Sequence, residues 1–94
     1  MFDEGRPVHG ERVVLFHAPG SGQTAMVATR RVGGAVERNR ARRILRAAWR
    51  EVALQALEGF DVVLVAREAI RGAKTRDVVV EMSDLLQRAG MARP

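Results

Sequence analysis

The sequence predicts a small α/β protein with one sheet and helices packed on it, and three observations lead to that fold class. The two longest apolar runs, Val13 to Phe16 and Val62 to Ala66, have the length of strands. Between them, residues 35–57 lack proline and glycine and are rich in alanine, leucine, arginine and glutamate, as a helix requires. With 94 residues, the chain suffices for one domain, residues 1–94, and is too short for two.

Strands are expected first along the chain. Glu11 to His17 has the β-prone composition of a strand and follows the turn-like Gly10. A loop rich in glycine and proline occupies residues 18–22. Residues 25–28 then predict a second strand, expected to pair with the first one in an antiparallel arrangement.

The long helix, residues 35–57, is predicted to begin after Gly33 and Gly34 and to stop before Gly59. At 100° per residue, its apolar residues share one arc about 100° wide, the width of a core-facing stripe. These residues are Ala41, Ile44, Leu45, Ala48 and Val52. Arginines occupy a different arc, which comprises Arg38, Arg42, Arg43, Arg46 and Arg50. One side of the helix should therefore pack in the core while another side carries positive charge.

A third strand is predicted over Phe60 to Ala66, and the Arg67 to Lys74 segment could contain a loop with one helical turn. Thr75 is a candidate N-cap for a last helix that ends at Gly90. The order β, β, α, β, α predicts a two-layer α/β sandwich. Helices would cover one face of the sheet, and the other face would be left to solvent or a ligand.

Several classes of site are not expected. The absence of cysteine excludes disulfides and thiolate chemistry, and the spacing of His9 and His17 does not match a metal motif. The N-terminus lacks the features of a signal peptide, and no apolar run approaches a membrane span, so a cytoplasmic protein without membrane partners is expected. No paired spacing typical of a two-metal nuclease is found among the acids considered, which are Asp3, Glu4, Glu11, Glu37, Glu58 and Asp61.

Positive charge is concentrated in one segment of the chain. Residues 30–50 contain eight arginines and one acid, a net charge of +7, so the rest of the chain carries −2 of the total of +5. A solvated helix face usually mixes the two signs through i, i+4 pairs, which this segment hardly does. Although a general arginine bias of the genome could contribute, charge this local favours nucleic-acid phosphates as the partner.

The same segment resembles the signature of the ribonuclease P protein family. In that family, a basic strand end leads to a glycine, an Ala-Val pair and an Arg-Asn-Arg triplet on a helix. The matching residues here are Gly33, Ala35, Val36, Arg38, Asn39 and Arg40, followed by the basic residues Arg42, Arg43 and Arg46. The resemblance continues through Gly59 to Arg67 and the last helix, and so covers nearly the whole chain.

This resemblance implies a mixed sheet with a left-handed β-α-β crossover, the ribosomal protein S5 domain 2-like fold, and two RNA contacts. The catalytic RNA would be bound by Arg30, Arg31, Gly33, Arg38, Asn39, Arg40, Arg42, Arg43 and Arg46. A cleft between the open sheet face and the first helix would hold the substrate's 5′ leader against Phe2, Val14 and Phe16. Strand alternation alone leaves open whether Val14 and Phe16 or Val13 and Leu15 face away from the helices.

The implied function is that of a ribonuclease P protein subunit, which helps the catalytic RNA to remove the 5′ leader from precursor tRNA. Catalysis would then belong to Mg²⁺ on the RNA, with no catalytic side chain, metal or cofactor on the protein, which would act as a monomer in a 1:1 complex. Alternatives are a non-enzymatic RNA-binding module, such as a ribosome-associated protein, and a nuclease acting alone. Two departures from the family are an apparently shortened N-terminal segment and Gly34 in place of the usual Asn.

Overall fold

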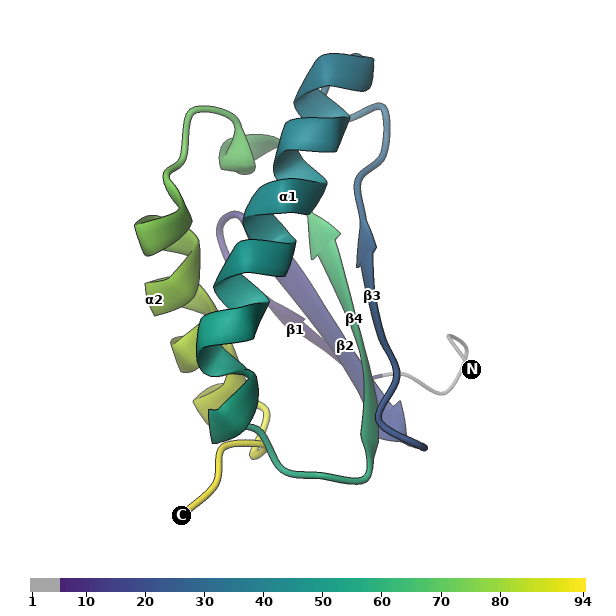
Figure 1. The fold of residues 1–94 in the computed structure, drawn as a ribbon, viewed down its shortest axis with the longest axis vertical. Coiled ribbons are helices and arrows are strands. Elements are labelled where there is room, and N and C mark those ends of the chain that lie inside the picture. Colours follow the sequence, from purple (N-terminus) through teal and green to yellow (C-terminus); the bar gives the residue numbers. More distant parts are fainter. Residues whose placement is uncertain (1–5) are drawn as a thin grey trace.

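The computed structural model describes residues 6–94, in which two helices cover one face of a four-stranded sheet (Figure 1). The strands are β1 (Arg6–His9), β2 (Val13–Pro19), β3 (Thr24–Val27) and β4 (Phe60–Ala66). The helices are α1 (Ala35–Val52) and α2 (Thr75–Arg88), with the short 3₁₀ turns η2 (Ala53–Gln55) and η3 (Glu68–Ile70) after α1 and β4. The predicted two-layer α/β fold is therefore confirmed.

The strands are ordered β1-β2-β4-β3, with β2 antiparallel to both neighbours and β3 parallel to β4. The expected antiparallel pairing of residues 25–28 with the preceding strand is therefore wrong. The loop before β3 passes over the beginning of β4 instead of turning back beside β2. Asp61 of β4 holds this loop, because its Oδ1 accepts hydrogen bonds from the amides of Gly22 (3.0 Å) and Gln23 (2.8 Å). Gly20 allows the close approach, since a Cβ there would lie 2.1 Å from the Asp61 carboxylate.

The β3-α1-β4 connection is a left-handed crossover. In Figure 1, α1 lies in front of the sheet, both strands point upward, and the chain moves from β3 to β4 on its left. Right-handed connections are the strong default for parallel strands. The handedness implied by the family resemblance is thus confirmed where the default rule would have failed.

The core lies between the sheet and the helices. Val13 and Leu15 of β2 point into it and are fully buried, together with the apolar residues of the two helices. All the apolar positions predicted for the first helix are buried in this core, namely Ala41, Ile44, Leu45, Ala48 and Val52. Because residues alternate along a strand, Val14 and Phe16 point to the other face of the sheet. Within residues 6–94, neither helix is long and apolar enough to cross a membrane.

The edge strand β1 is absent from the elements expected from sequence, since it has only four residues and contains Pro7. It pairs antiparallel with β2, with Pro7 opposite Phe16. The predicted strand beginning at Glu11 starts instead at Val13. Gly10 donates its amide to the Val13 carbonyl at 2.8 Å, which confines Glu11 to the turn between the two strands.

Both helix boundaries also differ from the predicted ones. The first helix ends before Leu57 because the chain tightens into η2 and turns away, and the Leu57 amide donates to the Met91 carbonyl at 2.7 Å. Thr75 is the first residue of α2 rather than its N-cap. The N-cap position is Lys74, whose amide donates to the Asp77 carboxylate at 3.0 Å.

Candidate nucleic-acid interface

Six arginines lie on the surface that α1 leaves outside the core. Arg43, Arg46 and Arg50 are exposed on its outer side. Arg40 is half-buried on the flank that faces α2, where its Nη2 donates to the Ala73 carbonyl at 2.7 Å. The other flank carries the remaining two arginines of the helix. We refer to the six together as the arginine surface, which comprises Arg38, Arg40, Arg42, Arg43, Arg46 and Arg50.

The arginine surface makes no ion pair with any residue that the structure describes. Among residues 6–94, the ion pairs within 4.0 Å involve only Arg12, Arg88 and Arg93 as cations. Hydrogen bonds to uncharged groups orient part of the surface: Arg38 donates to the Gly33 carbonyl at 3.1 Å, and Arg42 donates to the Asn39 side-chain oxygen. These contacts fix guanidinium positions while leaving their charge available to a phosphate.

The paired glycines shape the beginning of α1. Gly33 has φ +142°, a conformation that residues with a side chain rarely adopt, and an added Cβ would lie 3.0 Å from that of Glu37. Gly34 occupies the N-cap in an extended conformation and makes no side-chain cap. The ribonuclease P protein family usually has Asn at this position, and an Asn side chain can accept a hydrogen bond from the first amides of a helix. Gly34 has no side chain and provides no such acceptor to α1.

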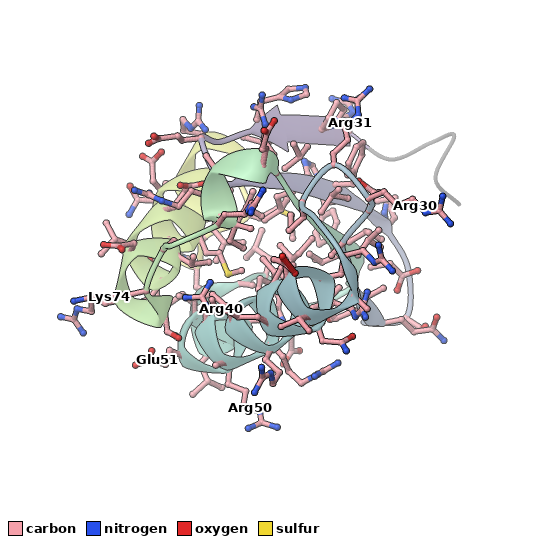
Figure 2. The ribbon with its side chains drawn as sticks, turned by 90° about the horizontal axis from the view of Figure 1, so that it is seen from above. Arg30, Arg31, Arg40, Arg50, Glu51 and Lys74 are labelled. Atoms are coloured by element: carbon pink, nitrogen blue, oxygen red, sulfur yellow. The ribbon has the colours of Figure 1, made fainter. Side chains whose placement is uncertain are left out.

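Arg30 and Arg31 lie apart from the arginine surface. Both are exposed in the turn that precedes α1. Figure 2 shows them beside the sheet, whereas Arg40 and Arg50 are labelled on the helical side. The set of RNA-binding residues expected from sequence is thus divided between two sides of the molecule.

The open face of the sheet carries a groove of about 470 Å³. It is lined by His9, Val14, Thr29, Arg31, Val65, Ala66, Arg67 and Glu68. Val14 is 9% exposed, and Phe16 is half-buried on the same face. The helix α1 packs on the opposite face of the sheet and so forms no wall of this groove. Phe2, the third expected cleft residue, lies outside the described residues.

A second groove separates α1 from the beginning of α2. Its volume is about 520 Å³, and it is lined by Arg40, Arg43, Ile44, Ala47, Lys74 and Thr75. Lys74 and Thr75 are residues that sequence reasoning missed as candidates for binding. No local pattern links them to the arginines of α1, and only the packing of the two helices brings them together.

Several carboxylates hold backbone groups of the fold. Glu81 accepts hydrogen bonds from the amides of Arg12 and Val13, both at 2.8 Å, and Asp61 and Asp77 hold the loop and helix end described above. Among residues 6–94, no group of three histidine, aspartate or glutamate side chains could hold a metal ion.

The two histidines lie near the sheet. His9 is exposed, whereas the half-buried ring of His17 packs edge-on against Phe60, with ring centres 6.1 Å apart. Partial burial, and secondly the charge of Arg6, lower the pKa of His17 below its usual 6.5. The His17 imidazole is therefore favoured in its neutral form.

Comparison with known proteins gives one consistent result. The family model "Ribonuclease P" matches residues 1–90. The ribonuclease P protein component of Shouchella clausii is 30% identical over 100% of this chain and 80% of its own length. The ribonuclease P protein from Thermotoga maritima, solved in complex with 1-(4-fluorophenyl)-2-thiourea, matches the fold with a TM-score of 0.79, at 24% identity over 93% of this chain and 88% of that one. The Staphylococcus aureus protein gives 0.78, at 18% identity over 98% and 87%.

Proposed function

Because this chain belongs to the ribonuclease P protein family, we propose that it makes two RNA contacts, one through the arginine surface and one through the open face of the sheet. The protein is a component of ribonuclease P, a ribonuclease of tRNA processing, and associates with ribonuclease P RNA in a ribonucleoprotein. In our proposal, the arginine surface of α1 binds that RNA. The open face of the sheet holds the single-stranded 5′ leader of precursor tRNA.

One observation carries the first half of the proposal: α1 presents six arginines, and none of them forms an ion pair with another of residues 6–94. Arg38 and Arg50 are twelve residues apart, so the surface extends about 18 Å along the helix axis. Guanidinium groups bind phosphates bidentately, and each phosphate neutralised releases condensed counterions. By screening repulsion between RNA strands, such a surface would let the RNA work at lower Mg²⁺.

The open face has the features that suit an unpaired strand. Phe16 is half-buried there, so part of its ring is accessible to a base, and stacking on an aromatic ring tolerates any base. Arg31 and Arg67 line the neighbouring groove and would bind the phosphates on either side of a stacked base. A leader of variable sequence needs this kind of contact rather than base-specific hydrogen bonds.

The hydrolysis itself is proposed to belong to the RNA, whose bound Mg²⁺ would activate the attacking water. Five of the carboxylates among residues 6–94 have structural contacts that support this division. Glu81, Asp61 and Asp77 accept backbone amides, while Glu58 and Asp84 pair with arginines. The protein would act as a single copy that binds and orients RNA.

The test is cleavage of a precursor tRNA at low Mg²⁺ by bacterial ribonuclease P RNA, with and without the protein. Wild-type protein should restore cleavage, and the Arg43→Gln and Arg46→Gln double variant should not. Arg40 is unsuitable for this test, since its bond to Ala73 also supports the fold. Arg6→Gln, which removes one positive charge at an exposed residue of the distant strand β1, is a control for general charge loss and should rescue cleavage as wild type does. Equal rescue by the double variant and the control would contradict the assignment to α1.

A further inference from the structure

The groove between α1 and α2 extends the cationic surface beyond the helix that carries the arginines. We propose that this groove binds a backbone phosphate of the same RNA, with Arg40 and Arg43 on one side and Lys74 on the other. This inference rests on the proposed function, because it takes the RNA bound by α1 as its ligand. It adds α2 to the contact, although the sequence shows no basic motif at Lys74.

The lining of the groove favours an anion. Of the six described residues that line it, three are cations and none is an acid, and the cations belong to α1 and to the N-cap of α2. Figure 2 shows the labelled Arg40 beside the beginning of α2, where Lys74 is labelled on the same side of the molecule. Cations brought together in this way repel one another, and a bound phosphate would convert that repulsion into attraction.

Arg40 is positioned in advance for this role. Its Nη2 donates to the Ala73 carbonyl at 2.7 Å, directly before Lys74, so one bond links the guanidinium to the opposite wall. A guanidinium has five N–H donors, which leaves others for a ligand. Because the contact is made in the protein alone, little side-chain freedom remains to be lost when a phosphate binds.

The two acids nearby lie outside the groove. The Asp77 carboxylate is directed to the helix end, where it accepts a hydrogen bond from the amide of Lys74 at 3.0 Å. Glu51 is exposed one turn beyond Ala47 on α1, past the end of the lining. Neither acid is among the residues that line the groove where Arg40, Arg43 and Lys74 meet.

The groove suits a nucleic-acid backbone better than a free nucleotide. The described residues that line it include no aromatic ring on which a base could stack, and its apolar part consists of the aliphatic residues Ile44 and Ala47. Arg43 belongs both to this groove and to the exposed outer side of α1. A strand lying on the arginine surface would reach Lys74 from Arg43 without a break in the cationic surface.

The experiment measures the affinity of the full-length protein for bacterial ribonuclease P RNA over a range of salt concentrations. Lys74→Gln should weaken binding about 3- to 10-fold at moderate salt and reduce the slope of log affinity against log salt by about one. Arg76→Gln is the matched control, because Arg76 is an exposed cation two residues further on that does not line the groove. It should change the affinity less than 2-fold, roughly the generic effect of a lost distant charge.

A double-mutant cycle tests whether the two helices share one phosphate. Lys74→Gln combined with Arg43→Gln should lose less affinity than the product of the two single losses, because the first substitution already removes part of the shared contact. Lys74→Gln combined with Arg50→Gln should give losses that multiply. Folding is not expected to change, since Lys74 is exposed and only its backbone hydrogen-bonds to α2; equal thermal melting temperatures would verify this.

The outcomes separate this inference from the proposed function. If Lys74→Gln behaves like Arg76→Gln while the Arg43→Gln and Arg46→Gln double variant binds weakly, the groove is not an RNA site and the function of α1 stands. If the affinity losses of Lys74→Gln and Arg43→Gln multiply in the double variant, the proposal that both residues bind one phosphate is wrong. If the double variant binds RNA as tightly as wild type, the proposed function itself fails.

Discussion

Replacing Phe16 tests the proposed leader contact. Its ring is half-buried on the open face of the sheet, between Pro7 of β1 and Val63 of β4 in the strand register, and it lies outside the core beneath the helices. Phe16→Ala removes the ring without opening a cavity in that core. Phe16→Leu is the matched control, because it keeps an apolar side chain of similar bulk but has no aromatic face.

The expected magnitude follows from stacking on a partly covered ring. Base–aromatic stacking is worth about 1–3 kcal/mol per base, and a ring with only part of its face available should contribute about 1–2 kcal/mol. At about 1.4 kcal/mol per tenfold change, this predicts a roughly 5- to 30-fold loss of affinity. The assay is binding of the reconstituted ribonucleoprotein to precursor tRNA with a leader and to the same tRNA without one.

Both variants should lose affinity for the tRNA with a leader, whereas binding of the leaderless tRNA should stay within about 2-fold of wild type. A loss of the same size for both tRNAs would refute the leader contact and indicate a general defect of the protein. Full retention of affinity by Phe16→Leu, with loss only for Phe16→Ala, would refute stacking and assign the effect to apolar packing.

Two further predictions concern the fold. Glu81→Ala should lower the free energy of unfolding by about 2–4 kcal/mol in urea denaturation, because it leaves the amides of Arg12 and Val13 without an acceptor. Asp84→Ala removes only an exposed i, i+4 ion pair and should lower the free energy of unfolding by less than about 0.5 kcal/mol. Because the pKa of His17 is lowered in the folded protein, the unfolded state takes up a proton first as the pH falls below about 6.5. The free energy of unfolding should therefore decrease on acidification. That part of the decrease should be absent in His17→Gln. Urea denaturation of both proteins between about pH 5 and 8 measures it, and an identical pH dependence would contradict it.

Sequence was sufficient where the signal is local and periodic. The core stripe of α1 and the buried strand β4 follow from spacing and from a continuous apolar run, and both lie where predicted. Such patterns are sound because a helix or central strand must bury the same residues in any packing that covers its apolar face. The single helical turn expected within Arg67 to Lys74 is present as η3.

The pairing of the strands could not be predicted correctly from the sequence. A local turn was the simplest connection between the first two predicted strands, yet residues 20–23 lead across β4. The decisive contact is the Asp61 carboxylate, which is about forty residues distant in sequence from the amides that it binds. No periodicity encodes such a contact. The glycines at 20 and 22 were visible, but they suit many loop paths equally well.

The candidate site shows the same limit. The sequence identified the arginines and the helix that carries them, since charge and helical spacing are local properties. It could not relate Arg43 to Lys74, which lie 31 residues apart and meet only because α2 packs against α1. Nor could it separate Arg31 from the arginine surface, because that depends on the turn at Gly33.

The two proposed RNA contacts lie on opposite faces of the sheet, and this has a mechanistic consequence. The arginine surface belongs to the helical layer, while Phe16 and the groove of Arg31 face the other way. The protein would therefore lie between the ribonuclease P RNA bound to α1 and the leader bound to the open face of the sheet. The loss of affinity caused by substituting Arg46 should then be the same with and without a leader on the tRNA. The loss caused by substituting Phe16 should appear only when the leader is present. Because the two sites share no residue among those described, their effects on substrate binding should multiply, and coupling between them would require a change in the sheet itself.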